Sequence, residues 1–423
     1  MRVSAGKKPT LVRRILSSLG PGVITGAADD DPSGIATCSI AGAQHGLALL
    51  WIALITWPLM AFIQMMCARI GMVSGRGLIG AFRRRIPRPF LIVAAFALFL
   101  ANSINTGADL SGMADAAEML TRVNSHILVI MFGAGIALAT IFFRYHQIAN
   151  ILKWLTLILF AYVITGFVVH PKWSEIARAT FLPSWPKNHG QWSTLVALLG
   201  TTISPYLFFW QTSQEVEEEK AMGRRMMAHR FGASKREIVD RKIDIDIGTF
   251  FSNLVTYFII LTTALALHRH GITEIKTSKD AAQALFPLAG NFAGLLFTVG
   301  LIGTGLLAIP TLTGSAAYAL SEVFAKREGL DQRFRGAPFF YFVIISSTIA
   351  GMLLDFFKVN PVQALYWSAV INGLLAPVLL VAIIFIALDR AVMKDQPSSI
   401  PSVIVVSVAT LLMLGAAIGM FVF

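Results

Sequence analysis

The chain has 423 residues, of which 56% are hydrophobic and only 14% are charged. Soluble proteins carry about 25% charged residues, so this composition excludes a soluble globular fold and predicts an integral membrane protein. The net charge of +12 does not indicate nucleic acid as a partner, because the basic residues lie in short segments between apolar runs. We therefore expect a lipid bilayer as the surroundings of the chain.

The first apolar run, about 17–46, contains the polar sequence Asp29-Asp30-Asp31-Pro32-Ser33-Gly34. Carboxylates at membrane depth are costly and normally mark an ion or substrate pathway. Proline also removes a backbone donor and breaks the helical ladder. We interpret the run as two half-helices joined by an unwound polar segment, which membranes tolerate only where it lines a cavity or is buried in protein.

Ten further apolar runs are long enough to cross a bilayer, which requires about 20 residues. The sixth of the eleven candidates, about 191–215, is the only other one that we predict to be broken, at Pro205. A short amphipathic stretch, 278–285, precedes helix eight. All eleven candidates are about 17–46, 48–72, 90–120, 125–144, 146–169, 191–215, 243–268, 288–318, 338–357, 361–388 and 400–423.

The distribution of Lys and Arg sets the orientation, because cytoplasmic loops carry an excess of both residues. The basic N-terminus, with Lys7, Lys8, Arg13 and Arg14, and the basic loops after even-numbered helices fall on one side. We expect that side to be the cytoplasm, with the C-terminus external, in the plasma (inner) membrane. The first run is too long for a signal peptide and should be retained.

Helices one and six are both broken by proline, at Pro32 and Pro205, five helices apart. An odd offset inverts the second unit, and paired interrupted helices point to the binding site of an inverted-repeat transporter. We expect a single transmembrane domain over 1–423: repeat one about 15–170, repeat two about 190–390, and helix eleven. The alternative is coincidence, since proline is frequent in transmembrane helices.

The two breaks together offer only oxygen ligands. The first supplies Asp31, Ser33 and the carbonyls near Gly34, with Asp29 and Asp30 just before them. The second reads Thr201-Thr202-Ile203-Ser204-Pro205-Tyr206. Oxygen ligands suit hard cations such as Mg²⁺. The three aspartates cannot all point one way, and we expect Asp31 to be the ligand; in the alternative interpretation it only caps the following half-helix.

Two other polar groups fall inside or beside the apolar runs. In helix three, Asn102, Asn105 and Asp109 share one face and are expected to line the pathway, or else to form interhelical hydrogen bonds. The acidic run 214–219 ends helix six. We interpret it as a solvated helical extension with paired charges; in the alternative it collects cations at the inner mouth.

Both breaks resemble motifs of the natural resistance-associated macrophage protein (NRAMP) family of divalent metal transporters. Asp31-Pro32-Ser33-Gly34 resembles the family's Asp-Pro-Gly-Asn, and Ser204-Pro205-Tyr206 resembles its Met-Pro-His. The resemblance extends over essentially the whole chain. It implies an all-α membrane protein with a LeuT-like fold of inverted five-helix repeats, and transport of a divalent cation by alternating access.

This sequence matches the family motif at the aspartate but departs from it at two other residues that bind the metal in the family. Gly34 replaces the family's asparagine and Ser204 its methionine, whose sulfur favours Mn²⁺ and Fe²⁺. The smaller residues enlarge the site, and Mg²⁺ usually keeps several waters. The pattern resembles the branch of NRAMP-related magnesium transporters. The resemblance implies that Asp31 binds the metal and that Thr201 offers a backbone carbonyl.

The resemblance also places residues along the proton route and the ion pathway. Asp109 matches a family aspartate, whereas Gly112 stands for a glutamate and Tyr206 for a histidine. Ala369 stands for a helix-ten glutamine, with Asn372 as a substitute, and Asp30 is expected beside the pathway. Having lost two titratable groups, the chain is expected to be an uncoupled uniporter for Mg²⁺, with Mn²⁺ also possible.

Three alternatives remain open. The first is a proton-coupled Mn²⁺/Fe²⁺ symporter of the main NRAMP type, and the second is an organic-solute symporter on the same fold. The third is an intramembrane protease that pairs Asp31 with Asp109, for which the sequence holds no accompanying motif. We expect a transporter and no enzyme, with no cofactor besides the transported metal.

Overall fold

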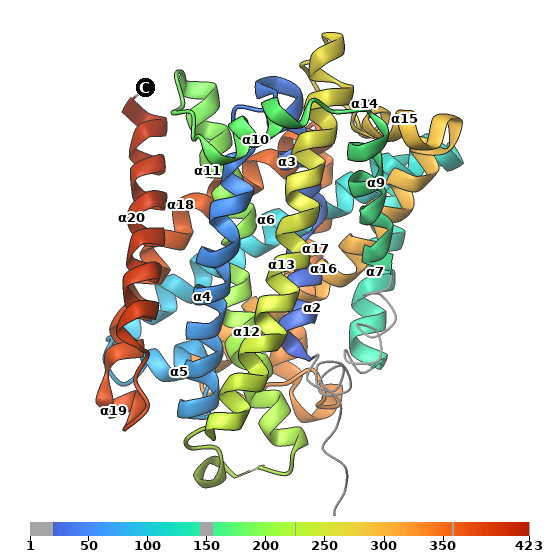
Figure 1. The fold of residues 1–423 in the computed structure, drawn as a ribbon. Helices are drawn as coiled ribbons and strands as arrows, with labels where there is room; N and C mark the ends of the chain where they lie inside the picture. The colour runs from blue at the N-terminus through green and yellow to red at the C-terminus, as the bar shows by residue number, and fades with distance from the viewer. Residues whose placement is uncertain (1–19, 144–154, 225, 358, 423) are drawn as a thin grey trace, which may run out of the picture.

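The computed structural model describes residues 20–143, 155–224, 226–357 and 359–422, and they are almost entirely helical (Figure 1). Within them, nine helical segments are long and apolar enough to cross a membrane. The first predicted span is divided into two short helices. The later part of the fifth predicted span, about 146–169, is a shorter apolar helix over Leu157–Val168. The short turn Arg144-Tyr145-His146 that the sequence predicts between the fourth and fifth spans lies outside the described residues.

The broken helices appear where the prolines predict them. Helix one is α2 (Pro21–Asp29) and α3 (Pro32–His45), and helix six is α11 (His189–Thr202) and α12 (Pro205–Ala221). The other helices are α4 (Trp51–Ser74), α5 (Leu78–Phe82), α6 (Arg88–Thr121), α7 (Ser125–Phe142), α9 (Phe160–Val168), α10 (Trp173–Phe181), α13 (Lys235–Ala266), α14 (Ser278–Ala282), α15 (Phe286–Ala289), α16 (Ala293–Val323), α17 (Pro338–Leu354), α18 (Pro361–Leu388), α19 (Arg390–Met393) and α20 (Ile400–Val422).

Two helix boundaries differ from the predicted ones because polar sequence continues the helix beyond the apolar run. Helix α13 begins at Lys235 instead of about 243, since Ser234 and Glu237 form a capping box at its start. Helix α12 continues to Ala221 through the acidic run. Helix α10 was not predicted; its short amphipathic sequence buries Ile176 and leaves Trp173 exposed.

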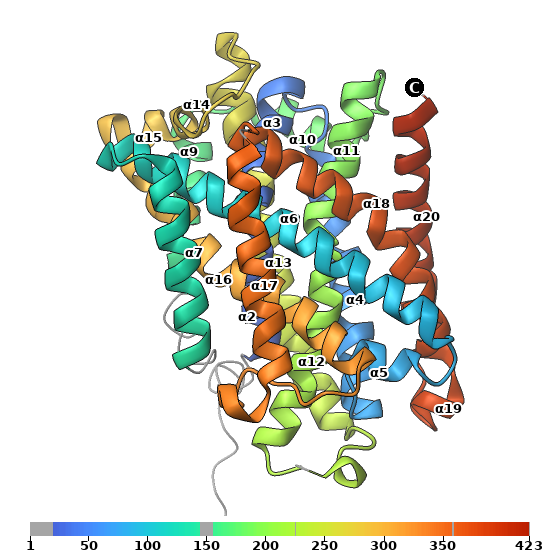
Figure 2. The ribbon, with the colours of Figure 1, turned by 180° about the vertical axis from the view of Figure 1, so that it is seen from behind.

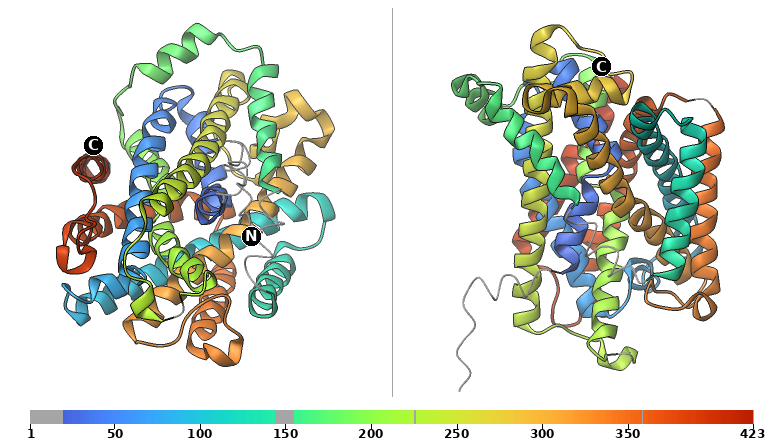
Figure 3. Two further views of the ribbon diagram at one scale, coloured as in Figure 1. Left: turned by 60° about the horizontal axis from the view of Figure 1, so that its bottom comes forward. Right: turned by 90° about the vertical axis from the view of Figure 1, so that its right-hand side faces the viewer.

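The broken helices lie inside the bundle, and unbroken helices surround them. Helices α2 and α3 pack along α13, α11 packs on α18, and α12 packs on α4 and α16. The views from two sides place α20 at one edge and α7 at the opposite edge (Figures 1 and 2). The view from below and the side view show α2 enclosed by its neighbours (Figure 3). Both breaks are therefore shielded from lipid.

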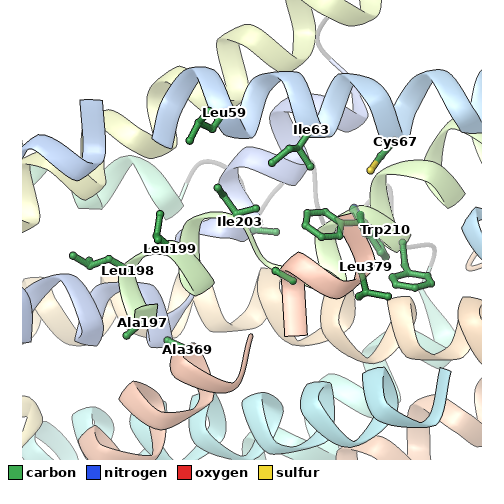
Figure 4. Packing of buried hydrophobic residues seen from close by; sticks show 14 of the residues in the cluster. Leu59, Ile63, Cys67, Ala197, Leu198, Leu199, Ile203, Trp210, Ala369 and Leu379 are labelled. Atoms are coloured by element: carbon green, nitrogen blue, oxygen red, sulfur yellow. The ribbon is translucent and has the colours of Figure 1, made fainter. Parts of the chain in front are cut away.

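Apolar side chains pack tightly against the second break. Leu59 and Ile63 of α4 point toward Ile203, the residue between α11 and α12, while Ala369 of α18 lies against the α11 side (Figure 4). Ile63 and Ala369 are fully buried, and Ile203 is 1% exposed. This packing holds the unwound segment in place, so that its polar groups can be presented to the first break.

Helices α11 and α18 touch backbone to backbone at Gly200. A Cβ on Gly200 would lie 2.1 Å from the carbonyl oxygen of Ala369 and 2.3 Å from the amide nitrogen of Gly373. No side chain can occupy that space unless the helices move apart. Gly200 therefore fixes the distance between the second break and α18.

We predict that Gly200→Ala lowers the free energy of unfolding by roughly 1–3 kcal/mol, the usual cost of overpacking. Gly135→Ala is the matched control, because nothing lies within 4 Å of a Cβ at that position of α7. Denaturant unfolding in mixed micelles measures both variants. Equal stability of the two variants would contradict the assigned contact.

Candidate metal site between the two broken helices

The first break is built around Asp31, which is 2% exposed. Its Oδ1 accepts a hydrogen bond from the amide of Gly34 at 2.6 Å and so caps α3, with Pro32 in the first turn. Its Oδ2 accepts a second bond, from Nδ2 of Asn105 on α6 at 3.1 Å. The predicted capping role is real, but it employs one carboxylate oxygen and leaves lone pairs on both.

Asn105 is held in turn by α18. The hydroxyl of Ser368 donates to Oδ1 of Asn105 at 2.6 Å, so the amide nitrogen of Asn105 points toward Asp31. Both residues are buried, at 0% and 2% exposed. The sequence predicted Asn105 beside the pathway but missed Ser368, because a single serine in an apolar helix carries no distinguishing signal.

The three aspartates separate, as their adjacency required. The hydroxyl of Ser252 on α13 lies 2.8 Å from Oδ2 of Asp29 and 3.1 Å from Oδ1 of Asp30. Asp29 and Asp30 are thus directed toward α13, while Asp31 is directed toward α6. Ser252 is a second residue that sequence reasoning missed.

At the second break, between α11 and α12, two hydroxyl groups donate hydrogen bonds to backbone carbonyl oxygens. Ser204 Oγ donates to the carbonyl oxygens of Gly200 and Thr201 at 2.7 and 2.9 Å, which satisfies the free end of α11. The phenol of Tyr206 donates to the carbonyl oxygen of Ala28 at 3.0 Å. Tyr206 therefore ties the second break to the end of α2.

The two breaks meet at the side-chain-free face of Gly34. Three oxygens surround the position that a Cβ would take there: Thr201 Oγ1 at 3.0 Å, and Asp29 O and Asp31 Oδ1 both at 3.4 Å. The hydroxyl oxygen of Thr201 is buried and has no hydrogen-bond partner among the described residues. A carboxylate, a carbonyl and an unpartnered hydroxyl thus converge on one small space.

The remaining predicted pathway residues lie nearby without joining this group. Asp109, on α6 one turn beyond Asn105, is fully buried and within electrostatic reach of Asp31. Its carboxylate has no side-chain hydrogen-bond partner within the described part of the chain, and the backbone of Ser33 lies within reach of it. Asn372 is buried on α18 beside Gly373. Ser33 is 1% exposed and lies beside the carboxylate of Asp31.

The acidic run at the end of helix six is not solvated, so that interpretation was wrong. Glu215, Glu217 and Glu219 are 1%, 9% and 3% exposed. The structure pairs them with Arg241, Lys220 and Arg224 respectively. The predicted helical extension and charge pairing are therefore present, but the glutamates are buried, and the pair of Glu215 with Arg241 is buried on both sides.

The donor set at the meeting point favours a hard cation that keeps part of its water. Within the described residues, no group of three or more His, Cys, Asp and Glu side chains could hold a metal ion. A single carboxylate with neutral oxygens cannot replace the whole hydration shell of a small divalent ion. No sulfur lies in this group of oxygens to favour a softer metal.

Comparison with known proteins gives consistent matches over the chain. The family model described as natural resistance-associated macrophage protein-like matches residues 22–423. The divalent metal cation transporter MntH of Verminephrobacter eiseniae is 26% identical over 90% of this chain and 83% of its own length. That of Yersinia enterocolitica is 28% identical over 73% of each chain.

Solved structures share the fold. A manganese transporter of Eremococcus coleocola superposes with a TM-score of 0.77 over 99% of this chain and 90% of its own, at 18% identity. The nucleobase-cation-symport transporter Mhp1 superposes with a TM-score of 0.55, at 14% identity and over 95% of this chain and 92% of its own. The expected LeuT-like arrangement, with helices one and six broken, is confirmed.

We predict that Asn105→Ala weakens divalent-cation binding by about 10- to 100-fold, the usual effect of losing a residue that orients a ligand. The variant removes the Nδ2 donor from Asp31 and leaves the hydroxyl of Ser368 with the carbonyl oxygen of Leu365 as its acceptor. The control is Asn102→Ala, one turn earlier on α6, whose side chain donates to Leu312 O instead. Calorimetric titration with Mg²⁺ and Mn²⁺ measures both; equal losses would contradict the role of Asn105.

Proposed function

Because the chain belongs to the natural resistance-associated macrophage protein family, whose model matches residues 22–423, we propose that it carries divalent metal cations across the plasma membrane by alternating access. Mg²⁺ is the preferred substrate in this proposal, and Mn²⁺ competes. The single observation that supports it best is the set of three oxygens around the open face of Gly34.

Asp31 supplies the charge in this proposal, and the carbonyl of Asp29 and the hydroxyl of Thr201 supply neutral oxygens. The carbonyl of Thr201 already accepts a hydrogen bond from Ser204, so its hydroxyl is the freer ligand. Gly34 and Ser204 leave room where larger side chains would displace water. Such a site selects a partly hydrated Mg²⁺ over ions that need a sulfur ligand.

We further propose uniport without proton coupling. At the positions of two expected titratable groups the chain has Gly112 and Tyr206, and the phenol of Tyr206 is engaged with Ala28. A doubly charged ion gains about 4.6 kcal/mol from a 100 mV potential, at about 2.3 kcal/mol per charge. With the cell interior negative, that potential alone drives uptake.

A proton-coupled Mn²⁺ symporter is the second candidate. The buried carboxylate of Asp109, which no side chain among the described residues pairs with, favours it, because a carboxyl group in that position can hold a proton instead of a cation. The relatives named for divalent metal or manganese transport are compatible with both candidates.

We predict that proteoliposomes containing the wild-type protein take up Mg²⁺, and that Asp31→Ala abolishes uptake. A pH-sensitive dye in the lumen should record no change during uptake. Asp115→Ala, at the far end of α6, is the control and should transport normally. Mn²⁺ uptake with acidification and without Mg²⁺ uptake would contradict the proposal and favour the symporter.

We also predict that Ser204→Met shifts the ratio of Mn²⁺ to Mg²⁺ transport toward Mn²⁺ by about tenfold, because the thioether adds a soft ligand and displaces water. Ser204→Ala removes the same hydroxyl without adding sulfur, so it should keep the wild-type ratio. Competition of unlabelled Mn²⁺ against Mg²⁺ uptake measures the ratio. An unchanged ratio in Ser204→Met would place the ion away from the second break.

A further inference from the structure

The start of α2 is capped by a residue from a distant helix. Asp244 of α13 accepts hydrogen bonds from the amides of Gly20, Gly22 and Val23 at 2.8, 2.7 and 3.1 Å. The first turn of α2 has no side-chain cap of its own. Its orphan amides, which carry the positive end of the helix dipole, are thus satisfied by one fully buried carboxylate.

Asp244 belongs to a closed ring of buried polar contacts. Arg241, one turn earlier on α13, contacts Asp244 Oδ2 at 2.6 Å and Glu215 of α12 at 2.7 Å. Gln211 then donates to Glu215 at 2.6 Å, and Thr25 of α2 donates to Gln211 at 2.7 Å. We call Asp244, Arg241, Glu215 and Gln211 the α2 latch. It joins α2, α12 and α13 at one end of the bundle.

The latch lies between the breaks and a polar cavity. The cavity of about 270 Å³ is lined by Glu215 and Arg241 of the latch and by residues nearer the start of α13, among them Glu237 and Asp240. In the other direction along α13, Ser252 contacts the first break eight residues after Asp244, about 12 Å along the helix. The latch therefore separates the breaks from the cavity.

Between Asp244 and Ser252, glycines line the contact of α2 with α13. Cβ atoms on Gly22 and Gly26 would lie 2.8 and 2.4 Å from backbone atoms of α13, and one on Gly248 would lie 2.4 Å from Gly22 O. Within the described residues, the hydrogen bonds that join α2 to α13 lie at the two ends of this line, at Asp244 and between Ser252 and Asp29. Opening the latch therefore frees the start of α2 to tilt away from α13, while its far end stays bonded to Ser252. The far end of α2 carries Asp29, whose carbonyl faces the candidate ion.

We propose that Asp244, positioned by Arg241 and Glu215, is the gate that closes the cation site from the cytoplasmic side. The ion leaves only after α2 has separated from Asp244. The buried charges make the gate all-or-none, because a partly opened ring leaves a carboxylate or guanidinium buried without its partner, which is strongly unfavourable. The gate's position facing the cytoplasm rests on the proposed function; its contacts with α2 do not.

The test is hydrogen exchange of full-length protein in lipid nanodiscs, comparing Asp244→Asn with Asp246→Asn. Both variants remove one negative charge from α13, but Asp246 is partly exposed and lies two residues beyond the latch. Asparagine cannot pair with Arg241 as a charge. We expect amides at 20–25 to exchange about tenfold faster in Asp244→Asn, with α3 unchanged, and no such change in Asp246→Asn.

The apparent KM for Mg²⁺ transport provides a second measurement, which the loss of a merely structural contact would leave unchanged. If Asp244→Asn favours the cytoplasm-open state, fewer molecules can bind external ion, so the apparent KM for Mg²⁺ should rise about tenfold. Glu215→Gln weakens the same latch while keeping the Asp244–α2 contact, and should shift both readouts in the same direction but less.

Unchanged exchange in α2, or equally faster exchange in every helix, would overturn the gate. Faster exchange confined to α2 in a protein whose wild type transports neither Mg²⁺ nor Mn²⁺ would support the latch and overturn the proposed cargo.

Discussion

A carboxylate buried halfway across a bundle of apolar helices requires compensation, and the arrangement around Asp31 follows from that requirement. The break between α2 and α3 supplies a backbone amide from Gly34, and α6 supplies the amide of Asn105. Neither donor carries a full charge. In our proposal, the remaining negative potential, next to the carboxyl-terminal end of α2, attracts the transported cation.

Small residues allow the two breaks to approach each other. Gly34 exposes a face to Thr201 instead of filling it, and Gly200 lets α11 and α18 touch backbone to backbone. Tyr206 then bonds to the end of α2, so the halves of helices one and six form one unit. In our account, selectivity for Mg²⁺ arises from the room for water at the site and from the absence of a sulfur ligand, more than from additional ligands. The opening of the unit depends on the latch at Asp244.

Local signals in the sequence were enough to predict both breaks, because Pro32 and Pro205 each interrupt an apolar run. The different directions of the three aspartates also followed from their adjacency. Partners on distant helices could not be predicted: Ser252 and Ser368 are ordinary residues until tertiary packing places them beside a carboxylate.

The acidic run that ends helix six shows a second reason why burial could not be predicted from the sequence. Its charges are typical of a solvated face, yet Arg241 arrives from α13 and allows Glu215 to be buried. Asp244, inside the predicted seventh span, was an intramembrane acid and could have been singled out on that ground. Its partners, the amides at the start of α2, carry no sequence signature at all.

The most direct test of the account is to locate the ion. Crystals grown with Mn²⁺ as a stand-in for Mg²⁺ and measured at the manganese absorption edge should give an anomalous peak between Asp31, the carbonyl of Asp29 and Thr201. Our account predicts that peak, with water completing the coordination, and its loss in Asp31→Ala. A peak at Asp29, Asp30 and Ser252, or none between the breaks, would contradict the central claim.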